Sequence, residues 1–271
     1  MELIDIGANL CHESFAPDLD SVLDRAACAG VQRIIVTGTS RADSEAAAAL
    51  ARRHRGRLHA TAGVHPHVAQ SFDRATAATI EALAAREEVV AIGETGLDFF
   101  RDFSPRGDQE RAFEAHLDLA SRLGLPVFLH ERDAHLRFVE ILRPYRDRLA
   151  RAVIHCFTGD RRNLDAYLDL DLHVGFTGWI CDERRGLHLR ELAGRIPADR
   201  LMLETDSPYL LPRDLRPRPR TRRNEPSRLA HIARVVASAT GETVEALAAR
   251  TTATARAFFA LPPGPEAAAG E

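Results

Sequence analysis

Val89-Val90-Ala91-Ile92-Gly93-Glu94-Thr95-Gly96-Leu97-Asp98 is the stretch that decides the fold. Its first five residues are small or apolar, and a short run without polar alternation is typical of a parallel strand that is covered on both faces. Glu94 follows at once, and a carboxylate at the end of a buried strand needs a cation, a hydrogen-bond donor or a proton. For an isolated glutamate, a helix cap or a core ion pair would be the simpler interpretation. The same pattern recurs along this chain, however, and that recurrence favours a functional site.

Eight short apolar runs of this kind alternate with segments of helical periodicity, such as 107–123, which ends before the helix-stopping Gly124. Regular alternation of strands and helices predicts a parallel sheet, and eight repeats predict a (β/α)₈ barrel. An open doubly wound sheet is the alternative, although no glycine-rich nucleotide-binding motif supports it. We expect one barrel domain over residues 1–260 and a flexible tail over 261–271. The predicted strands are 3–7, 33–37, 58–62, 89–93, 126–129, 152–154, 173–176 and 201–203.

The composition restricts the class of protein. The chain has 271 residues, of which 45% are hydrophobic and 28% charged, as is typical of a globular protein. With a net charge of −3, any affinity for nucleic acid has to come from a local patch. The four cysteines form no C-x-x-C pair, so we expect reduced thiols and a cytoplasmic protein. No apolar stretch is long enough to span a membrane.

Polar residues follow the predicted strands at the points where each strand ends. In a barrel these ends meet on one face, where active sites lie. Histidine or a carboxylate stands at five of the eight ends, which is more than a chance arrangement would give. The residues that follow the strands are, in order, Asn9, Thr37, His65, Glu94, His130, His155, Thr177 and Asp206.

Two imidazoles with carboxylates can hold a divalent ion and leave coordination positions open. Such an ion lowers the pKa of bound water and polarises a phosphoryl or carbonyl oxygen. Asp206 is the candidate for the group that takes the proton of the water. No G-x-S-x-G elbow indicates a serine nucleophile instead.

Four motifs, in order along the chain, resemble the TatD family of metal-dependent nucleases, which has an amidohydrolase-like barrel. The resemblance covers about residues 3–259, and segments 182–187 and 222–226 resemble the founding branch of the family in particular. The four motifs are Gly63-Val64-His65-Pro66-His67, Gly93-Glu94-Thr95-Gly96-Leu97-Asp98-Phe99, His155-Cys156-Phe157-Thr158-Gly159 and Glu204-Thr205-Asp206-Ser207-Pro208-Tyr209-Leu210.

The resemblance implies metal ligands at Glu94, His130 and His155, with Asp206 as a ligand or proton acceptor. His65 would contact the substrate or support the metal ligands. The wider family opens with Asp-x-His-x-His, whereas Gly7 and Asn9 stand at those imidazole positions here. This departure puts a complete second metal site in doubt. It also favours the oxygen-preferring Mg²⁺, with Mn²⁺ as the alternative, over zinc.

The segment after the eighth predicted strand is rich in arginine. Six arginines lie between residues 213 and 223, among them Arg218 and Arg220, and three prolines keep this loop extended. A solvated basic surface and an electrostatic track for a phosphate backbone are both consistent with this composition. Trp179 could stack on a base or cap the barrel. Arg132, two residues after His130, could hold a phosphate or pair with a neighbouring acid.

These features together predict a metal-dependent phosphodiesterase that acts on DNA, with RNA as a second candidate substrate. The family resemblance implies a monomeric 3′→5′ exonuclease for single strands, with a role in DNA repair or nucleic-acid turnover. One alternative is another hydrolase on the same barrel, for an amide, lactone or aminoacyl ester. The arginine-rich loop disfavours it, because small neutral substrates need no such track. The other is a non-catalytic nucleic-acid-binding protein, which would not need Glu94, His130, His155 and Asp206.

Overall fold

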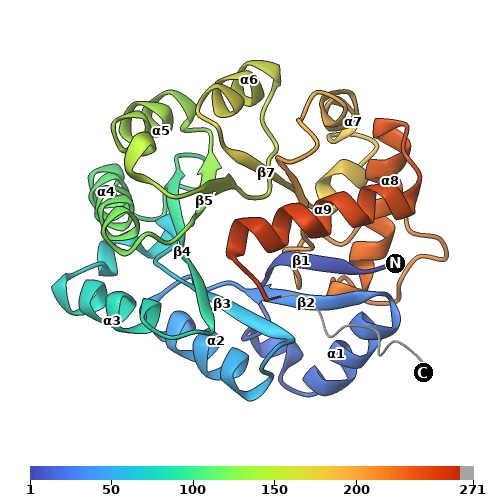
Figure 1. Ribbon diagram of the computed structural model, residues 1–271, viewed down its shortest axis with the longest axis horizontal. Helices are drawn as coiled ribbons and strands as arrows, with labels where there is room; N and C mark the ends of the chain where they lie inside the picture. The colour runs from blue at the N-terminus through green and yellow to red at the C-terminus, as the bar shows by residue number, and fades with distance from the viewer. Residues whose placement is uncertain (263–271) are drawn as a thin grey trace.

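Eight parallel strands form one sheet in the order β1 to β8 in the computed structural model, which describes residues 1–262. Figure 1 shows the strands as an inner ring, with helices α1 to α8 around it. The predicted (β/α)₈ barrel is therefore confirmed. The strands are β1 (Leu3–Ala8), β2 (Val31–Val36), β3 (Leu58–Ala62), β4 (Val89–Asp98), β5 (Val127–Arg132), β6 (Ala152–Ile154), β7 (His173–Phe176) and β8 (Leu201–Leu203).

The ring closes between β1 and the segment that follows β8. The backbone N–H of Asn9 donates to the carbonyl of Ser207 at 2.7 Å, and the N–H of Asp206 donates to the carbonyl of Gly7 at 2.8 Å. Ala8 and Ser207 form a parallel bridge at the same point. These bonds fix Asp206 at the carboxyl-end mouth of the barrel.

The long helices follow the strands in the predicted alternation. The left-handed Gly124 (φ 68°) ends α4 as expected, and its N–H donates to the carbonyl of Ala120. The helices are α1 (Leu19–Cys28), α2 (Arg41–Arg53), α3 (Arg74–Ala84), α4 (Arg106–Leu123), α5 (His135–Leu142), α6 (Arg161–Asp169), α7 (Leu187–Ala193), α8 (Leu229–Thr240) and α9 (Val244–Phe259).

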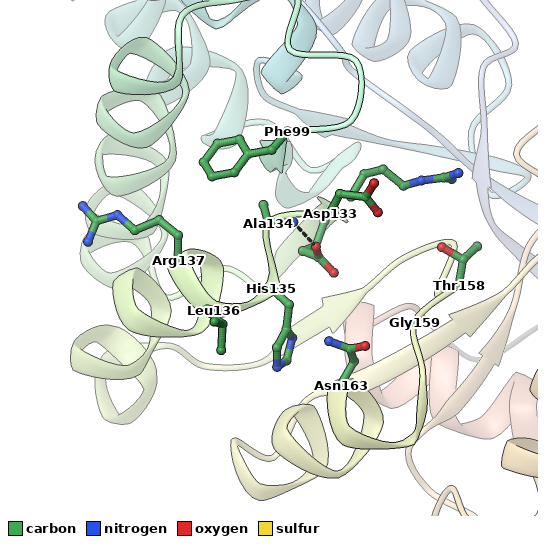
Figure 2. Close-up of a pocket in the computed structure, with 11 residues that line it drawn as sticks. Phe99, Asp133, Ala134, His135, Leu136, Arg137, Thr158, Gly159 and Asn163 are labelled. Atoms are coloured by element: carbon green, nitrogen blue, oxygen red, sulfur yellow. Dashed lines mark hydrogen bonds between the residues drawn. The ribbon is translucent and has the colours of Figure 1, made fainter.

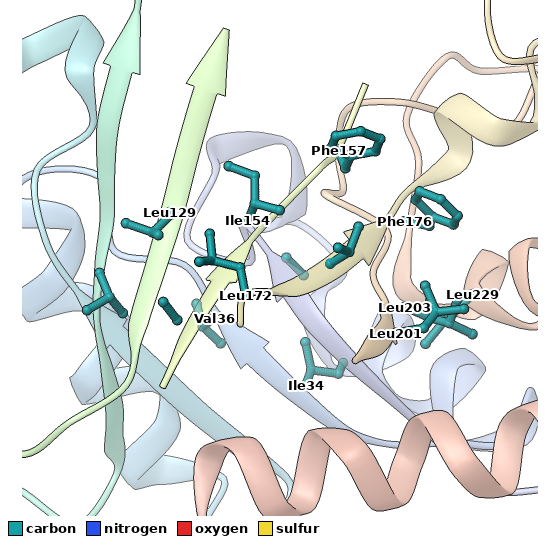
Figure 3. Close-up of a cluster of buried hydrophobic side chains, with 14 of the residues drawn as sticks. Ile34, Val36, Leu129, Ile154, Phe157, Leu172, Phe176, Leu201, Leu203 and Leu229 are labelled. Atoms are coloured by element: carbon teal, nitrogen blue, oxygen red, sulfur yellow. The ribbon is translucent and has the colours of Figure 1, made fainter. Parts of the chain in front are cut away.

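Two hydrophobic cores hold the barrel together. The larger core lies between the strands and the surrounding helices, and Figure 3 shows part of it, including Ile154, Phe176 and Leu229. The smaller core fills the inside of the barrel, where Ile4, Phe128 and other strand residues pack with Phe258 of α9. Helix α9 lies across the ring of strands in Figure 1 and closes its amino end.

The main difference from the sequence prediction concerns the ends of β4 and β5. Glu94 and His130 lie inside these strands rather than after them. The reason is that the two strands keep pairing beyond their apolar runs, as far as Asp98 opposite Arg132. A polar stretch with two glycines gives no sequence indication of this extra pairing.

The expected division into a 1–260 domain and a 261–271 tail stays a prediction. Leu261 is buried and packs in the smaller core. Residues 263–271 of the predicted tail lie outside the described part of the chain. Within the described residues, no helix is long and apolar enough to cross a membrane.

Candidate active site

Three histidines approach one carboxylate oxygen at the carboxyl end of the barrel. The Oε1 atom of Glu94 lies 2.7 Å from Nε2 of His155, 3.0 Å from Nδ1 of His130 and 3.2 Å from Nε2 of His65. Glu94 and His155 are 4% and 5% exposed. The structure therefore brings together four of the residues that the strand-end pattern singled out.

The tautomers of these histidines follow from their second nitrogens. Nδ1 of His65 accepts from the backbone N–H of His67, so a neutral His65 carries its proton on Nε2 and donates it to Glu94. Burial lowers the pKa of His65 to about 4, which keeps the ring neutral. His65 thus orients the Glu94 carboxylate. Neither ring nitrogen of His65 has a lone pair that is free to bind a cation.

His155 has the opposite arrangement. Its Nδ1 lies 3.3 Å from Oε2 of Glu204, a fully buried carboxylate, so Nδ1 is the donor and Nε2 points its lone pair at Glu94. Burial opposes a positive charge on this ring, but the charges of Glu94 and Glu204 raise the pKa of His155 well above its usual value. A proton or a cation has to lie between Nε2 and the Glu94 oxygen, because two acceptors at 2.7 Å repel each other.

His130 completes this arrangement. Its Nδ1 lies 3.4 Å from Nε2 of His155, and its Nε2 faces Oδ2 of Asp98 at 3.4 Å. Asp98 also accepts a hydrogen bond from Nε2 of His67 at 2.7 Å. Burial opposes the ionisation of Asp98, but the neighbouring His130 and the hydrogen bond with His67 hold its pKa well below the usual range. Asp98 can therefore orient His130 as Glu204 orients His155.

These contacts fit a divalent cation. Two imidazole nitrogens and one carboxylate oxygen converge within 3.4 Å of one another, and each imidazole has a carboxylate behind it. Carboxylate-supported histidines are the usual arrangement around a metal in proteins. His65, Glu94 and His130 also satisfy the distance criteria for a metal site, but the hydrogen bond of His65 Nδ1 makes His155 the better third ligand.

Asp206 lies at the same mouth. Its Oδ1 accepts a hydrogen bond from Nδ2 of Asn9 at 2.9 Å. Burial raises the pKa of Asp206 to about 7, and the negative charges of Glu94 and Glu204 act in the same direction, although His155 opposes them. A carboxyl group with this pKa can exchange a proton near neutral pH.

The space around Glu204 explains the departure at residue 7. A Cβ atom at Gly7 would lie 2.6 Å from Oε2 of Glu204, and a Cβ at Gly175 would lie 2.5 Å from Oε1. The same carboxylate accepts a hydrogen bond from the backbone N–H of Cys156. Gly7 therefore supplies room for Glu204, and Asn9 is bound to Asp206, so neither replaces the absent imidazoles as a ligand.

The predicted substrate-binding residues fall into two groups. The guanidinium of Arg132 lies 5.0 Å from the ring centre of Phe100 and 5.3 Å from that of Trp179, which also contacts Arg185 at 4.5 Å. Phe100 is 56% exposed, so part of this stack faces solvent. Arg132 is the last residue of β5, and Phe100, Trp179 and Arg185 lie on the segments that follow β4 and β7, at the mouth of the barrel.

Arg218 and Arg220 are exposed, and among the described residues neither has an ion pair or a side-chain hydrogen bond. Arg223 is different, because its guanidinium binds both carboxylate oxygens of Asp18 at 2.7 and 2.8 Å. Arg218 and Arg220 are therefore available to an anionic partner. Arg223 instead attaches the loop to the barrel through Asp18.

A cavity of about 440 Å³ opens beside the histidine cluster. Figure 2 shows that Phe99, His135 and Asn163 line it, between the loops that lead into α5 and α6. Arg132 lies at its wall, but Glu94 and His155 do not. The cavity thus neighbours the candidate active site, since Arg132 of its wall follows His130 by two residues.

Glu204 and Asp98 are the site residues to which the sequence analysis gave no role. Both were visible within the motifs, as carboxylates in or directly after apolar strands. Nothing in the sequence indicates, however, that each lies behind one histidine. Those relations depend on the assembly of the sheet, in which β4 pairs with β5 and β7 alone separates β6 from β8, so that residues 49 positions apart come into contact.

Comparison with known proteins relates the whole chain to one group. The family model for TatD-related DNases matches residues 4–260. A curated relative from Erwinia billingiae, named 3′-5′ ssDNA/RNA exonuclease TatD, is 54% identical over 96% of this chain and 100% of its own length. YjjV, a TatD homologue from Escherichia coli, has a crystal structure that matches with a TM-score of 0.87 and 28% identity, over 96% of this chain and 98% of that chain. An amidohydrolase from Saccharomyces cerevisiae shares the fold at 22% identity, with a TM-score of 0.83 over 96% of this chain and 100% of its own.

Proposed function

Because this chain belongs to the family of TatD-related DNases, we propose that it is a metal-dependent 3′→5′ exonuclease that degrades single-stranded DNA and RNA. The observation that carries the proposal is the convergence of His130 Nδ1 and His155 Nε2 on one oxygen of Glu94. Binding of a nucleic acid alone would not need two desolvated imidazoles around a buried carboxylate. Hydrolysis with the help of a divalent ion does need such a group of ligands.

Glu94, His130 and His155 would hold the cation, and Asp206 would stand at its open side. When bound, the ion would polarise the phosphodiester and make the attacking water more acidic. We assign Mg²⁺ as the ion, with Mn²⁺ as the alternative, because the mouth supplies two carboxylates and no thiolate ligand. The Gly7 and Asn9 contacts support one ion rather than two.

The residues of the chain would divide the other tasks. Asp206 accepts the proton of the attacking water, and Asn9 holds the Asp206 carboxylate in position. His65 keeps Glu94 oriented, and Glu204 and Asp98 fix the rings of His155 and His130. A displacement of any of these positioning side chains would move the reacting groups and slow the reaction.

The substrate would lie across the stack of Arg132 and Trp179. An unpaired base can stack on an exposed aromatic ring, whereas a base inside a duplex cannot, so this surface favours single strands. Arg218 and Arg220 would contact the phosphates further along the strand. Such contacts position the backbone without reading its sequence.

End-labelled single-stranded oligonucleotides test this proposal directly. The protein is incubated with DNA or RNA strands labelled at the 5′ or the 3′ end, in Mg²⁺, in Mn²⁺ or with EDTA. We expect metal-dependent shortening from the 3′ end, and a strand with a blocked 3′ end as a control should be degraded more slowly. Cleavage that is insensitive to EDTA would refute the metal role.

An ester and an amide substrate in the same assay examine the alternative hydrolase function. Turnover of these compounds at a rate similar to that of the oligonucleotides would contradict the assignment of nucleic acid as the substrate. Binding of the strands without any turnover in all metals would favour the non-catalytic alternative. The comparison separates the three functions in one set of conditions.

A further inference from the structure

A second group of potential metal ligands lies outside the histidine cluster. The side chains of Cys181, Asp214 and His231 each place one donor atom within 4.8 Å of the other two. Nε2 of His231 lies 2.7 Å from Oδ1 of Asp214. The three residues come from separate segments, namely the 3₁₀ helix Gly178–Cys181, the loop after β8 and helix α8.

None of these three residues takes part in the site described above. That site uses Glu94, His130, His155 and Asp206, on β4, β5 and the ends of β6 and β8. Asp214 begins the arginine-rich loop, and Cys181 follows Trp179 by two residues. The second group therefore joins the two segments that carry the proposed substrate-binding residues.

The burial of the three side chains suits an ion that enters from solvent. Cys181 is completely buried, while the side chains of His231 and Asp214 are 22% and 18% exposed. The sulfur of Cys181 thus lies on the buried side of the site. The imidazole of His231 and the carboxylate of Asp214 lie on the side that faces solvent. A water molecule at the open side would provide the fourth ligand of a tetrahedral ion.

The ligand chemistry differs from that of the catalytic cluster. A thiolate with an imidazole and a carboxylate selects a borderline-soft ion such as Zn²⁺, and a thiolate is a poor ligand for Mg²⁺. Arg190 approaches Oδ2 of Asp214 at 3.9 Å and also donates to the carbonyl of Ile180. This arginine holds the carboxylate so that its other oxygen, Oδ1, faces His231.

We propose that Cys181, Asp214 and His231 form a second metal-binding site that takes Zn²⁺, distinct from the catalytic metal site. The ion replaces the thiol proton of Cys181, which is released to solvent. It links the 3₁₀ helix after β7 to the start of the arginine-rich loop and to α8. Without an ion, Asp214 would accept hydrogen bonds from both His231 and the thiol of Cys181.

Cobalt substitution in a catalytic-site variant tests the proposal. In the full chain, His130→Ala/His155→Ala removes two ligands of the other site, so that a remaining bound ion reports on this one. After chelator treatment and addition of Co²⁺, we expect one bound equivalent and a near-ultraviolet thiolate-to-cobalt charge-transfer band. Addition of Zn²⁺ should displace the cobalt and remove the band.

Variants in the same background identify the ligands. Cys181→Ala should abolish the band, and His231→Gln should weaken cobalt binding by about 10-fold or more, at least the effect of disturbing a metal ligand's supports. Cys28→Ser is the matched control, because Cys28 is an exposed cysteine that lies outside the group, and the band should persist. If Cys181→Ala does not fold, Asp214→Asn takes its place and should also weaken binding.

Two results would overturn the proposal. One is the absence of bound cobalt in the His130→Ala/His155→Ala protein, which would leave a hydrogen-bonded Cys181–Asp214–His231 contact only. The other is a charge-transfer band that survives Cys181→Ala, because the sulfur ligand would then be another cysteine. Neither result depends on nuclease activity, so the test is independent of the proposed function.

Discussion

The two ends of the barrel are built from the same eight strands but differ in every physical property. At the amino end, Ile4, Ile35 and Met202 point inward and pack against Phe258 of α9. At the carboxyl end, the same strands or their extensions carry Glu94, His130 and other ionisable groups. The difference teaches that stability and chemistry are separated along the barrel axis, as is usual in this fold.

The separation has a physical reason. Carboxylates and imidazoles that are removed from water lower the stability of the folded state unless they are paired. At the carboxyl end they depend on one another, since Glu94 has its pKa held well below the usual range by His155 and His65 against the effect of burial. Apolar packing at the other end offsets this cost without any constraint from catalysis.

The largest expected effect comes from removing ligands at the carboxyl end. His130→Ala/His155→Ala should lower the rate of oligonucleotide hydrolysis by about 10⁴-fold or more, the range seen when essential catalytic groups are removed. The melting temperature should fall, because the buried Glu94 carboxylate loses two of its partners. Single-turnover assays and thermal unfolding measure the two effects. Retained turnover together with retained metal would disprove the ligand assignment.

At the same end, Asp206→Asn tests whether Asp206 acts as the base or as a metal ligand. It keeps the shape of the side chain but removes the proton acceptor, so the chemical step should slow by roughly 10²–10⁴-fold. Metal affinity should fall little. A Mg²⁺ titration of the variant under single-turnover conditions decides the role, because recovery of a near-normal rate at high Mg²⁺ would make Asp206 a ligand and not the base.

Truncation of a buried side chain at the amino end should lower the stability of the protein and leave catalysis unchanged. Phe258→Ala should lower the free energy of unfolding by about 3–5 kcal/mol, the usual effect for a buried phenylalanine, while kcat per folded molecule stays unchanged. Urea unfolding and steady-state kinetics test both parts. Leu136→Ala, at a leucine that is 81% exposed, is the control and should change neither. A fall in kcat would show that the two ends are coupled.

A pH titration compares two buried histidines that respond in opposite directions. Burial lowers the pKa of His116 to about 4, below its unfolded value of 6.5, whereas the pKa of His155 is raised. The neutral form of His116 is thus favoured in the folded state. Its stabilisation is complete above pH 6.5 and is lost as the pH falls towards 4, by about 3 kcal/mol.

His116→Gln should remove this part of the acid sensitivity. The glutamine oxygen can still accept the hydrogen bond that the Val64 N–H donates to Nε2 of His116. Urea unfolding at pH 7 and at pH 4.5 should show a smaller difference for the variant than for the unmodified protein. An equal difference in both proteins would mean that His116 is not the responsible group.

The smallest effect is expected from the arginine-rich loop. Log affinity for a single strand should fall with log salt concentration by roughly 0.7 per phosphate contact, and Arg218→Ala/Arg220→Ala should reduce this slope. KM should rise more than kcat falls. Arg52→Ala/Arg53→Ala, on exposed residues at the far end of α2, is the matched control. If both pairs change the slope equally, the loop is only a solvated surface.

Sequence reasoning was most successful where one physical signal determines the structure. β3, β6, β7 and β8 have the predicted limits, because each is a short and fully buried run of mainly apolar residues. The polar residues at the strand ends were found for the same reason. Their meeting on one face then follows from the barrel itself.

The rest depends on contacts between distant segments. Glu204 and His155 meet only when β6, β7 and β8 assemble side by side, and Cys181 and His231 meet only when α8 packs beside the segment after β7. Their spacing in the sequence contains no period that would reveal these pairs. The extension of β4 through Glu94 likewise depends on the partner strand β5.

Glu204 and the glycine at position 7 also constrain how this site can evolve. A histidine at residue 7 would collide with the Glu204 carboxylate, since even a Cβ atom would lie 2.6 Å from it. Loss of Glu204 first would leave His155 Nδ1 and the N–H of Cys156 without their acceptor. Each single step is therefore harmful on its own, and a chain with Gly7 and Glu204 gains an imidazole at residue 7 only if both residues change together. The close fit between Gly7 and Glu204 therefore makes an imidazole at residue 7 costly to introduce one substitution at a time.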